Sequence, residues 1–195
     1  MSMLATLWVH IVNKLGRPRT ALILALSLAA VLGAVNGLDF PLSVPYQRRV
    51  TGQGYLDFCS YCSAAAVQTQ VEALGAQGRL LQALLLCTID ILIPTLTCVF
   101  GIAALAALTR RWRARGSSIG WLLALPVAGM LLDFAENMSI VGLLIRYPVP
   151  SPVLAGMEGL LSGLKNTAYA LVVLSVVVLL AVNAVLRPRT VEVRQ

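Results

Sequence analysis

Charged residues and histidine are scarce in this 195-residue chain. Only 12% of the residues are charged, about half of the roughly 25% typical of soluble domains, whereas 58% are hydrophobic. This composition excludes an ordinary soluble domain and indicates a membrane protein. The single histidine, His10, lies near the N-terminus, which excludes a metal site of several histidines and a Ser-His-Asp triad inside a membrane. We therefore expect no metal ion and no other cofactor.

Long apolar runs take the place of the missing charge. Crossing the hydrocarbon core takes about 20 mostly apolar residues, and four runs qualify, at about 21–38, 80–108, 119–145 and 153–186. Only helices and closed barrels satisfy their backbone hydrogen bonds in lipid, so runs of this length are predicted to be helices. The sequence predicts an all-α, four-helix transmembrane bundle that forms one domain over residues 1–195.

The basic residues gather at one end of the predicted bundle. Ten of them flank the first and last spans and the link between the second and third: Lys14, Arg17, Arg19, Arg110, Arg111, Arg113, Arg115, Arg187, Arg189 and Arg194. Cytoplasmic loops of membrane proteins carry an excess of Lys and Arg. We therefore expect a multi-pass protein of the cell inner membrane with both termini in the cytoplasm. The net charge of +7 is then mostly a topology signal, and we expect no nucleic-acid partner.

The predicted outer connection, residues 39–79, has two halves of different character. Its first half, DFPLSVPYQRRVTGQG, contains two prolines and two glycines and is predicted to be irregular. In its second half Val67, Val71 and Leu74 recur at i, i+4 and i+7, a spacing typical of an amphipathic helix. We expect a short helix over 63–74 that caps the bundle or lies on the outer membrane surface.

Four ionisable residues fall inside the predicted spans: Asp90, Asp133, Glu136 and Lys165. A lone charge at the centre of a span costs about 2.5–3.5 kcal/mol. At about 1.5 Å per helical residue, all four lie roughly 27–33 Å along their helices from a basic cluster. Three helices are therefore predicted to bring these charges to one layer, where Pro94 also frees a backbone carbonyl near Asp90.

The predicted layer holds more acid than base. Because one lysine cannot neutralise three carboxylates, we expect at least one carboxyl group to keep its proton. We interpret the layer as an acid–base pocket with Asp133 or Glu136 as general acid, Asp90 as its partner and Lys165 as the orienting charge. Further candidate ligand-binding residues on the same helices are Asn137, Asn166 and Glu158. The expected ligand is a membrane lipid or another hydrophobic or amphiphilic molecule such as an isoprenoid, and the sequence leaves open whether the protein is an enzyme.

Three other interpretations of the layer remain. It would serve as a relay in a proton- or ion-coupled transporter, which with only four spans needs a homo-oligomer. It would pair with the helices of a membrane partner protein if the chain were an accessory or immunity protein. It would also act as a polar clasp that only fixes helix register.

Two of the four cysteines form a CxxC motif in the outer connection. Cys59 and Cys62 are candidates for a structural disulfide, a redox pair or two free thiols. Four spans, cytoplasmic ends and this motif are similar to the quinone-coupled thiol oxidases of the bacterial inner membrane, which carry a second external pair that this chain lacks. Cys87 and Cys98 lie about 16 Å apart along one predicted helix, too far apart to form a disulfide.

Several short motifs follow one another from Tyr55 to about Leu180. They are YLDF, then ALGAQGR leading into DILIP, then DFAEN and the lysine of the last span. With them the chain resembles a family of small multi-pass bacterial membrane proteins that has an intramembrane DxxEN motif and no assigned function. The resemblance implies that Asp90, Asp133, Glu136, Asn137 and Lys165 act as one unit, and it implies no particular reaction.

Overall fold

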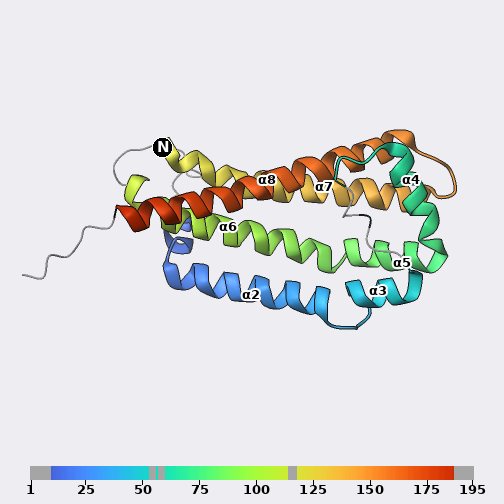
Figure 1. Ribbon diagram of the computed structural model, residues 1–195, viewed down its shortest axis with the longest axis horizontal. Helices are drawn as coiled ribbons and strands as arrows, with labels where there is room; N and C mark the ends of the chain where they lie inside the picture. Colours follow the sequence, from blue (N-terminus) through green and yellow to red (C-terminus); the bar gives the residue numbers. More distant parts are fainter. Residues whose placement is uncertain (1–9, 53–55, 57–59, 114–117, 187–195) are drawn as a thin grey trace, which may run out of the picture.

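The structure is a computed structural model that describes residues 10–52, 56, 60–113 and 118–186. Its helices are α2 (Pro18–Gly37), α3 (Val44–Thr51), α4 (Ala64–Ala73), α5 (Gly75–Leu86), α6 (Ile89–Arg113), η2 (Ser118–Leu123), α7 (Ala124–Arg146) and α8 (Pro152–Val185). The described residues contain no strand, so the predicted all-α class is confirmed (Figure 1).

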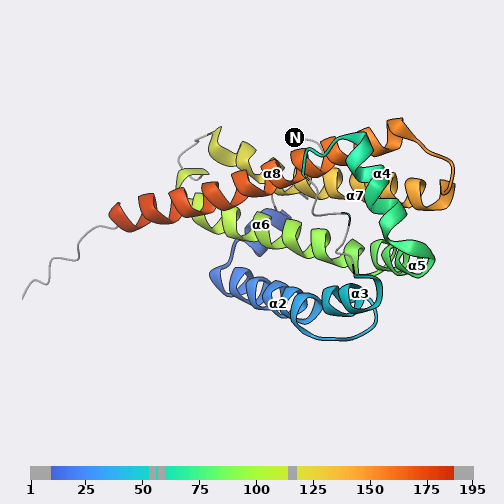
Figure 2. The same cartoon turned by 45° about the vertical axis from the view of Figure 1, so that its right-hand side comes forward.

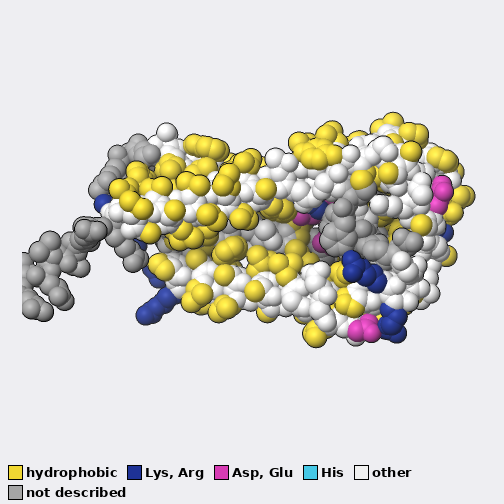
Figure 3. All heavy atoms as spheres, in the orientation of Figure 1, with side chains coloured by type: hydrophobic (Ala, Val, Ile, Leu, Met, Phe, Trp, Pro, Cys, Tyr) yellow, Lys and Arg dark blue, Asp and Glu magenta, His cyan; other side chains and the backbone are white. Residues whose placement is uncertain are grey.

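Four segments are long and apolar enough to cross a membrane: Pro18–Gly37, Gly75–Arg113, Ser118–Arg146 and Pro152–Val185. Helices α6, α7 and α8 pack against one another, and α2 packs mainly against α6 at the edge of the bundle (Figure 2). Hydrophobic side chains cover much of the long face of the bundle, and basic side chains lie towards its ends (Figure 3). The fold is thus compatible with a multi-pass membrane protein and has a three-helix centre.

The second predicted span is divided into two helices. α5 ends at Leu86, α6 begins at Ile89, and Cys87 and Thr88 form the break. The Thr88 hydroxyl donates to the carbonyl oxygen of Leu84 at 2.5 Å, which replaces part of the interrupted ladder. The break places Asp90 in the first turn of α6.

The prediction of an irregular first half for the outer connection is wrong, because α3 occupies Val44–Thr51. Ser43 caps this helix by accepting a hydrogen bond from the backbone N–H of Tyr46 at 3.2 Å. Pro45 lies in the first turn, where a helix needs no N–H, and Gly52 ends the helix with a φ of 69°. Proline and glycine here start and stop a helix instead of preventing one.

The short helix predicted over 63–74 corresponds to α4. Ser63 caps it through the backbone N–H of Ala66 at 3.3 Å. Val67, Val71 and Leu74 are all buried, in a cluster that includes Ile140 and Ala155 from α7 and α8. α4 therefore caps the bundle, crossing its end beside α8 (Figure 2).

Residues 60–62, just before α4, cross α8 where that helix has two glycines. The backbone N–H of Tyr61 donates to the carbonyl oxygen of Gly159 at 2.8 Å, and the hydroxyl groups of Tyr61 and Thr167 lie 2.9 Å apart. A Cβ added at Gly159 would collide with the carbonyl of Cys62, and one added at Gly163 would collide with the ring of Tyr61. A GxxxG motif usually brings two helices together, whereas this one receives a loop.

We predict opposite effects for two Gly→Ala substitutions on α8. Gly156→Ala meets open space and should keep or raise the melting temperature in detergent, because glycine costs a helix interior about 0.8–1.0 kcal/mol relative to alanine. Gly159→Ala should instead lower the free energy of unfolding by about 1–3 kcal/mol, because a backbone atom must move. Equal melting temperatures for the two variants would contradict the docking of residues 60–62 on α8.

Candidate functional site

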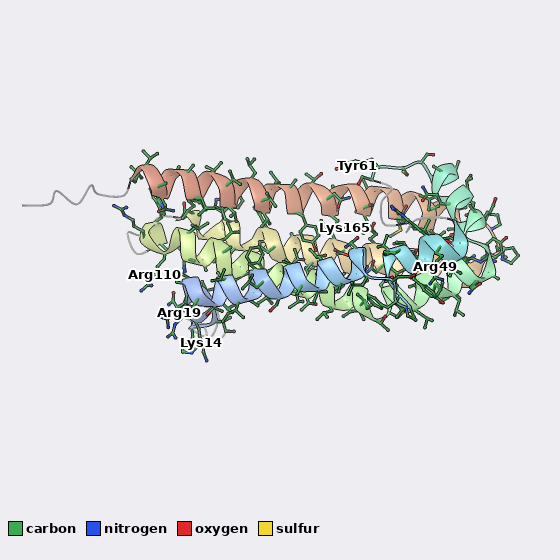
Figure 4. The ribbon with its side chains drawn as sticks, turned by 60° about the horizontal axis from the view of Figure 1, so that its bottom comes forward. Lys14, Arg19, Arg49, Tyr61, Arg110 and Lys165 are labelled. Carbon is green, nitrogen blue, oxygen red and sulfur yellow. The ribbon has the colours of Figure 1, made fainter. Side chains whose placement is uncertain are left out.

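The four ionisable residues predicted inside the spans are all buried, and we call them the acid–lysine layer: Asp90, Asp133, Glu136 and Lys165. Lys165 Nζ on α8 lies 2.5 Å from Glu136 Oε2 on α7, and the two side chains are only 5% and 0% exposed. In Figure 4 Lys165 lies inside the bundle, between the end that carries Arg19 and Arg110 and the end that carries Arg49. An ion pair this deep holds α7 and α8 at a fixed register, because separating it would leave both charges in an apolar medium.

Pro94 and Asn137 together explain how α6 joins the layer. Proline has no N–H, so Pro94 cannot donate the helical hydrogen bond to the carbonyl of Asp90, four residues earlier. The side-chain Nδ2 of Asn137 on α7 donates to that carbonyl at 3.3 Å. The carbonyl that the sequence predicted to be freed is therefore used to attach α6 to α7.

Tyr169 is a member of the site that the sequence analysis missed. Its hydroxyl donates to Asp133 Oδ2 at 3.0 Å, and it lies close enough to Asp90 for an electrostatic interaction. Gly129 makes room for its ring, since a Cβ there would lie 2.7 Å from a ring carbon. The available signal was the spacing, because Tyr169 follows Lys165 by four residues and so shares its helix face.

Glu158 also faces the interior from α8, as predicted. It is 0% exposed and precedes Lys165 by seven residues, which is two helical turns on the same face. Ser162 lies between them, is also 0% exposed, and was not singled out from the sequence. The buried face of α8 is thus polar over three turns, from Glu158 to Tyr169.

Asn166 does not join the layer, contrary to our expectation. It lies on the exposed side of α8, where its Nδ2 donates to Ser60 Oγ at 2.5 Å. Successive residues of a helix point about 100° apart, so the side chains of Asn166 and Lys165 lie on different faces of α8. Asn166 holds the loop at residues 60–62 and is not placed to contact a ligand in the layer.

An apolar groove of about 320 Å³ opens beside the layer, between the α5–α6 break and α7. Its lining residues are Leu86, Cys87, Ile91, Phe134, Asn137, Met138 and Val141. Ile91 and Met138 are 51% and 73% exposed, so the groove is open on the outer surface of the bundle. Asn137 is 6% exposed, and its buried Oδ1 accepts no hydrogen bond from the described residues. The groove is thus lined by one amide side chain among apolar residues.

The cysteines divide between a disulfide and free thiols. Cys62 is disulfide-bonded, and Cys59, the partner that the CxxC spacing predicts, lies outside the described residues. Cys87, which lines the groove, is an exposed free thiol, and Cys98 is a buried one. Cys62 is the last of the residues that cross α8, which favours a structural role for its disulfide in holding this loop.

No protein-family model matches the chain, and neither a curated protein nor a solved structure is significantly similar to it. In the part of the chain that the structure describes, no three His, Cys, Asp or Glu residues are grouped so that they could hold a metal ion. The function must therefore be argued from the layer, the groove and the charges at the ends of the bundle.

We predict a strong coupling between Asn137 and Pro94. Asn137→Leu removes a donor from a buried carbonyl and should lower the free energy of unfolding by about 1–3 kcal/mol. In a Pro94→Ala background the loss should be much smaller, because alanine, unlike proline, supplies the helical N–H at this position. A double-mutant cycle based on detergent unfolding measures the difference. Asn36→Leu is the control, since Asn36 donates to the carbonyl of Leu32 in its own helix and should show no coupling to Pro94→Ala. An equal loss of stability for Asn137→Leu in the parent protein and in the Pro94→Ala background would contradict this account.

The Lys165–Glu136 pair should respond differently to single and paired substitution. Lys165→Met leaves the buried Glu136 carboxylate without its cation and should destabilise the bundle by about 3–5 kcal/mol. Adding Glu136→Gln removes that charge and should restore most of the stability. Melting temperatures of the three proteins in detergent test this, and a double variant as unstable as Lys165→Met would show that the ion pair is not the cause.

Proposed function

We propose that the protein binds a membrane-dissolved amphiphilic ligand, a lipid or an isoprenoid, in the groove beside the acid–lysine layer. The observation that carries this proposal is that Asn137, whose buried Oδ1 accepts no hydrogen bond from the described residues, lines an apolar groove. A hydrocarbon chain would fill the groove, and a hydroxyl or other donor group on it would reach the amide. A volume of about 320 Å³ lies near the lower end of the roughly 300–1,000 Å³ typical of ligand pockets.

The exposure of the groove supports entry from the bilayer. Ile91 and Met138 lie on the lipid-facing surface, so a molecule dissolved in the membrane reaches the groove sideways without crossing the bundle. A water-soluble ligand would have to leave water for an apolar surface with one amide to offer, which is unfavourable. The chemistry of the groove therefore selects for a hydrophobic partner.

The layer supplies acid–base groups next to this groove. Asn137 bonds the backbone of Asp90 and follows Asp133 by four residues on one face of α7, so a ligand group at Asn137 lies on the same side of that helix as the Asp133 carboxyl group. If the protein is an enzyme, Asp133 or Glu136 acts as general acid, Asp90 as its partner and Lys165 as the orienting charge. Lys165 would act through its contact with Glu136, and Tyr169 through its hydrogen bond to Asp133.

A transporter is less well supported, because the hydroxyl groups towards the basic end point back to their own helices. Thr95 and Thr97 donate to Ile91 and Ile93 on α6, and Ser175 donates to Leu171 on α8. Hydroxyl groups used in this way offer no continuous polar path from the layer to that end of the bundle. We favour a pocket over a through-route for this reason.

We further propose that the basic end faces the cytoplasm of a bacterial inner membrane. Lys14, Arg19 and Arg110 lie together at that end (Figure 4), and an excess of Lys and Arg marks the cytoplasmic side. Residues 60–62 and the Cys62 disulfide would then lie on the oxidising side, where disulfides persist.

Filling the groove should remove the ligand. Ile91→Trp places a large side chain in the groove, and Leu92→Trp adds the same side chain at a neighbouring position of similar exposure that does not line it. Native mass spectrometry of protein purified in mild detergent, followed by titration with farnesol, should show at least about a tenfold loss of binding for Ile91→Trp only, equivalent to about 1.4 kcal/mol. Alkylation of the Cys87 thiol in a Cys98→Ala background gives a second readout, because bound farnesol should slow it.

Two outcomes would contradict the proposal. If Ile91→Trp and Leu92→Trp retain co-purified lipid and farnesol equally, the groove is not a binding site. If no ligand is retained by the parent protein and farnesol leaves Cys87 alkylation unchanged, the layer is a polar clasp without a ligand.

A further inference from the structure

A second hollow lies at the basic end of the bundle, far along the helices from the acid–lysine layer. It has a volume of about 560 Å³ and is lined by Asn13, Arg17, Arg110 and Arg113. An adjoining hollow of about 400 Å³ shares Arg110 and is lined otherwise by Ala107, Leu108, Arg111 and Asn183. Three of the four residues around the larger hollow are arginines, and none of the described lining residues is acidic.

The fold holds these arginines together. Val12, in the helical residues 10–15, is buried against the core that contains Leu105 and Ala106 of α6. Gly16 permits this close approach, since a Cβ there would lie only 3.1 Å from that of Ala106. The chain then turns at Arg17 into α2, which places its guanidinium group beside the last turn of α6.

Arg113 is fixed in position by two hydrogen bonds. Its Nε donates to the Thr109 hydroxyl at 3.2 Å, and its Nη2 donates to the carbonyl of Ala106 at 2.9 Å. Thr109 is fully buried, so this arginine is anchored in the bundle rather than extended into water. An arginine held in this way loses little side-chain freedom when its other N–H groups bind an anion, and its planar fork matches phosphate geometry.

The two hollows share Arg110 and differ in character. The larger one, with Arg17 and Arg113, suits a phosphate group. The smaller one adds Ala107 and Leu108 beside Arg111, and these apolar side chains suit the start of an acyl chain. Trp121, 64% exposed, also lies at this end, and exposed tryptophan is typical of the membrane–water interface. A free phosphate would use only half of this arrangement.

We propose that this end of the bundle binds the phosphate headgroup of an anionic phospholipid in the adjacent leaflet, with Arg17, Arg110 and Arg113 as its ligands. Basic hollows between membrane helices are suited to such headgroups. This site is separate from the groove at Asn137, and the proposal does not depend on the ligand proposed there.

The test compares phosphatidylglycerol with phosphatidylcholine of identical acyl chains, each titrated into detergent-solubilised protein and followed by native mass spectrometry. Phosphatidylglycerol should bind more tightly than phosphatidylcholine. The double variant Arg17→Gln with Arg110→Gln should weaken phosphatidylglycerol binding about 25-fold, at roughly a factor of five for each basic residue. Arg113 is left intact because its hydrogen bonds support the fold. If the double variant does not fold, each single variant tests the site with about a fivefold loss.

Arg48→Gln with Arg49→Gln is the matched control, because it removes the same charge at the opposite end of the bundle and should leave phosphatidylglycerol binding unchanged. Ile91→Trp should also leave it unchanged, which separates this site from the groove. An equal loss in the Arg48/Arg49 control would overturn the proposal in favour of diffuse charge attraction. Equal binding of phosphatidylcholine would overturn the headgroup preference. Inorganic phosphate that displaces the lipid at comparable concentration would show a phosphate site instead.

Discussion

The buried ion pair between Lys165 and Glu136 is the interaction on which the arrangement of this bundle depends. Neither charge is tolerable alone in an apolar interior, so α7 and α8 must pack in the one register that joins them. That register also brings the Tyr169 hydroxyl to Asp133 and gives the Tyr169 ring its place over Gly129. Two of the three central helices are therefore aligned by polar contacts, while apolar side chains cover much of their exposed surface.

α6 is attached to α7 at the point where Pro94 interrupts the hydrogen bonding of its helix. Pro94 removes a hydrogen bond from the backbone of Asp90, and Asn137 replaces it from α7. The α5–α6 break just before Asp90 opens the surface on which the groove lies, so the features that make this span irregular also create the space beside the layer.

The two hollows differ in what they offer a lipid. The groove at Asn137 is apolar with one amide, deep along the bundle, whereas the hollow at Arg110 is charged and lies at the basic end. Among the described residues they share no lining residue, and their linings differ in charge. A protein with both would hold a hydrophobic ligand while staying anchored in an anionic leaflet.

Composition and spacing alone determined much of this protein. The spans, the burial of the charged residues, the α4 helix and the carbonyl freed by Pro94 all follow from apolar length, helical periodicity and the chemistry of proline, which are local properties. Three features could not be predicted from these local properties: the start of α3, the division of α5 from α6 and the role of Tyr169. Each depends on a partner distant in sequence or on a helix cap that competes with a turn. Asn166 illustrates the limit most clearly: it neighbours Lys165 in sequence, yet it bonds Ser60 outside the bundle. The sequence predicted how far along the bundle each polar group lies. Only the packing of α6, α7 and α8 decided which of these groups contact one another, because contact depends on the rotation of each helix as well as on the position along it.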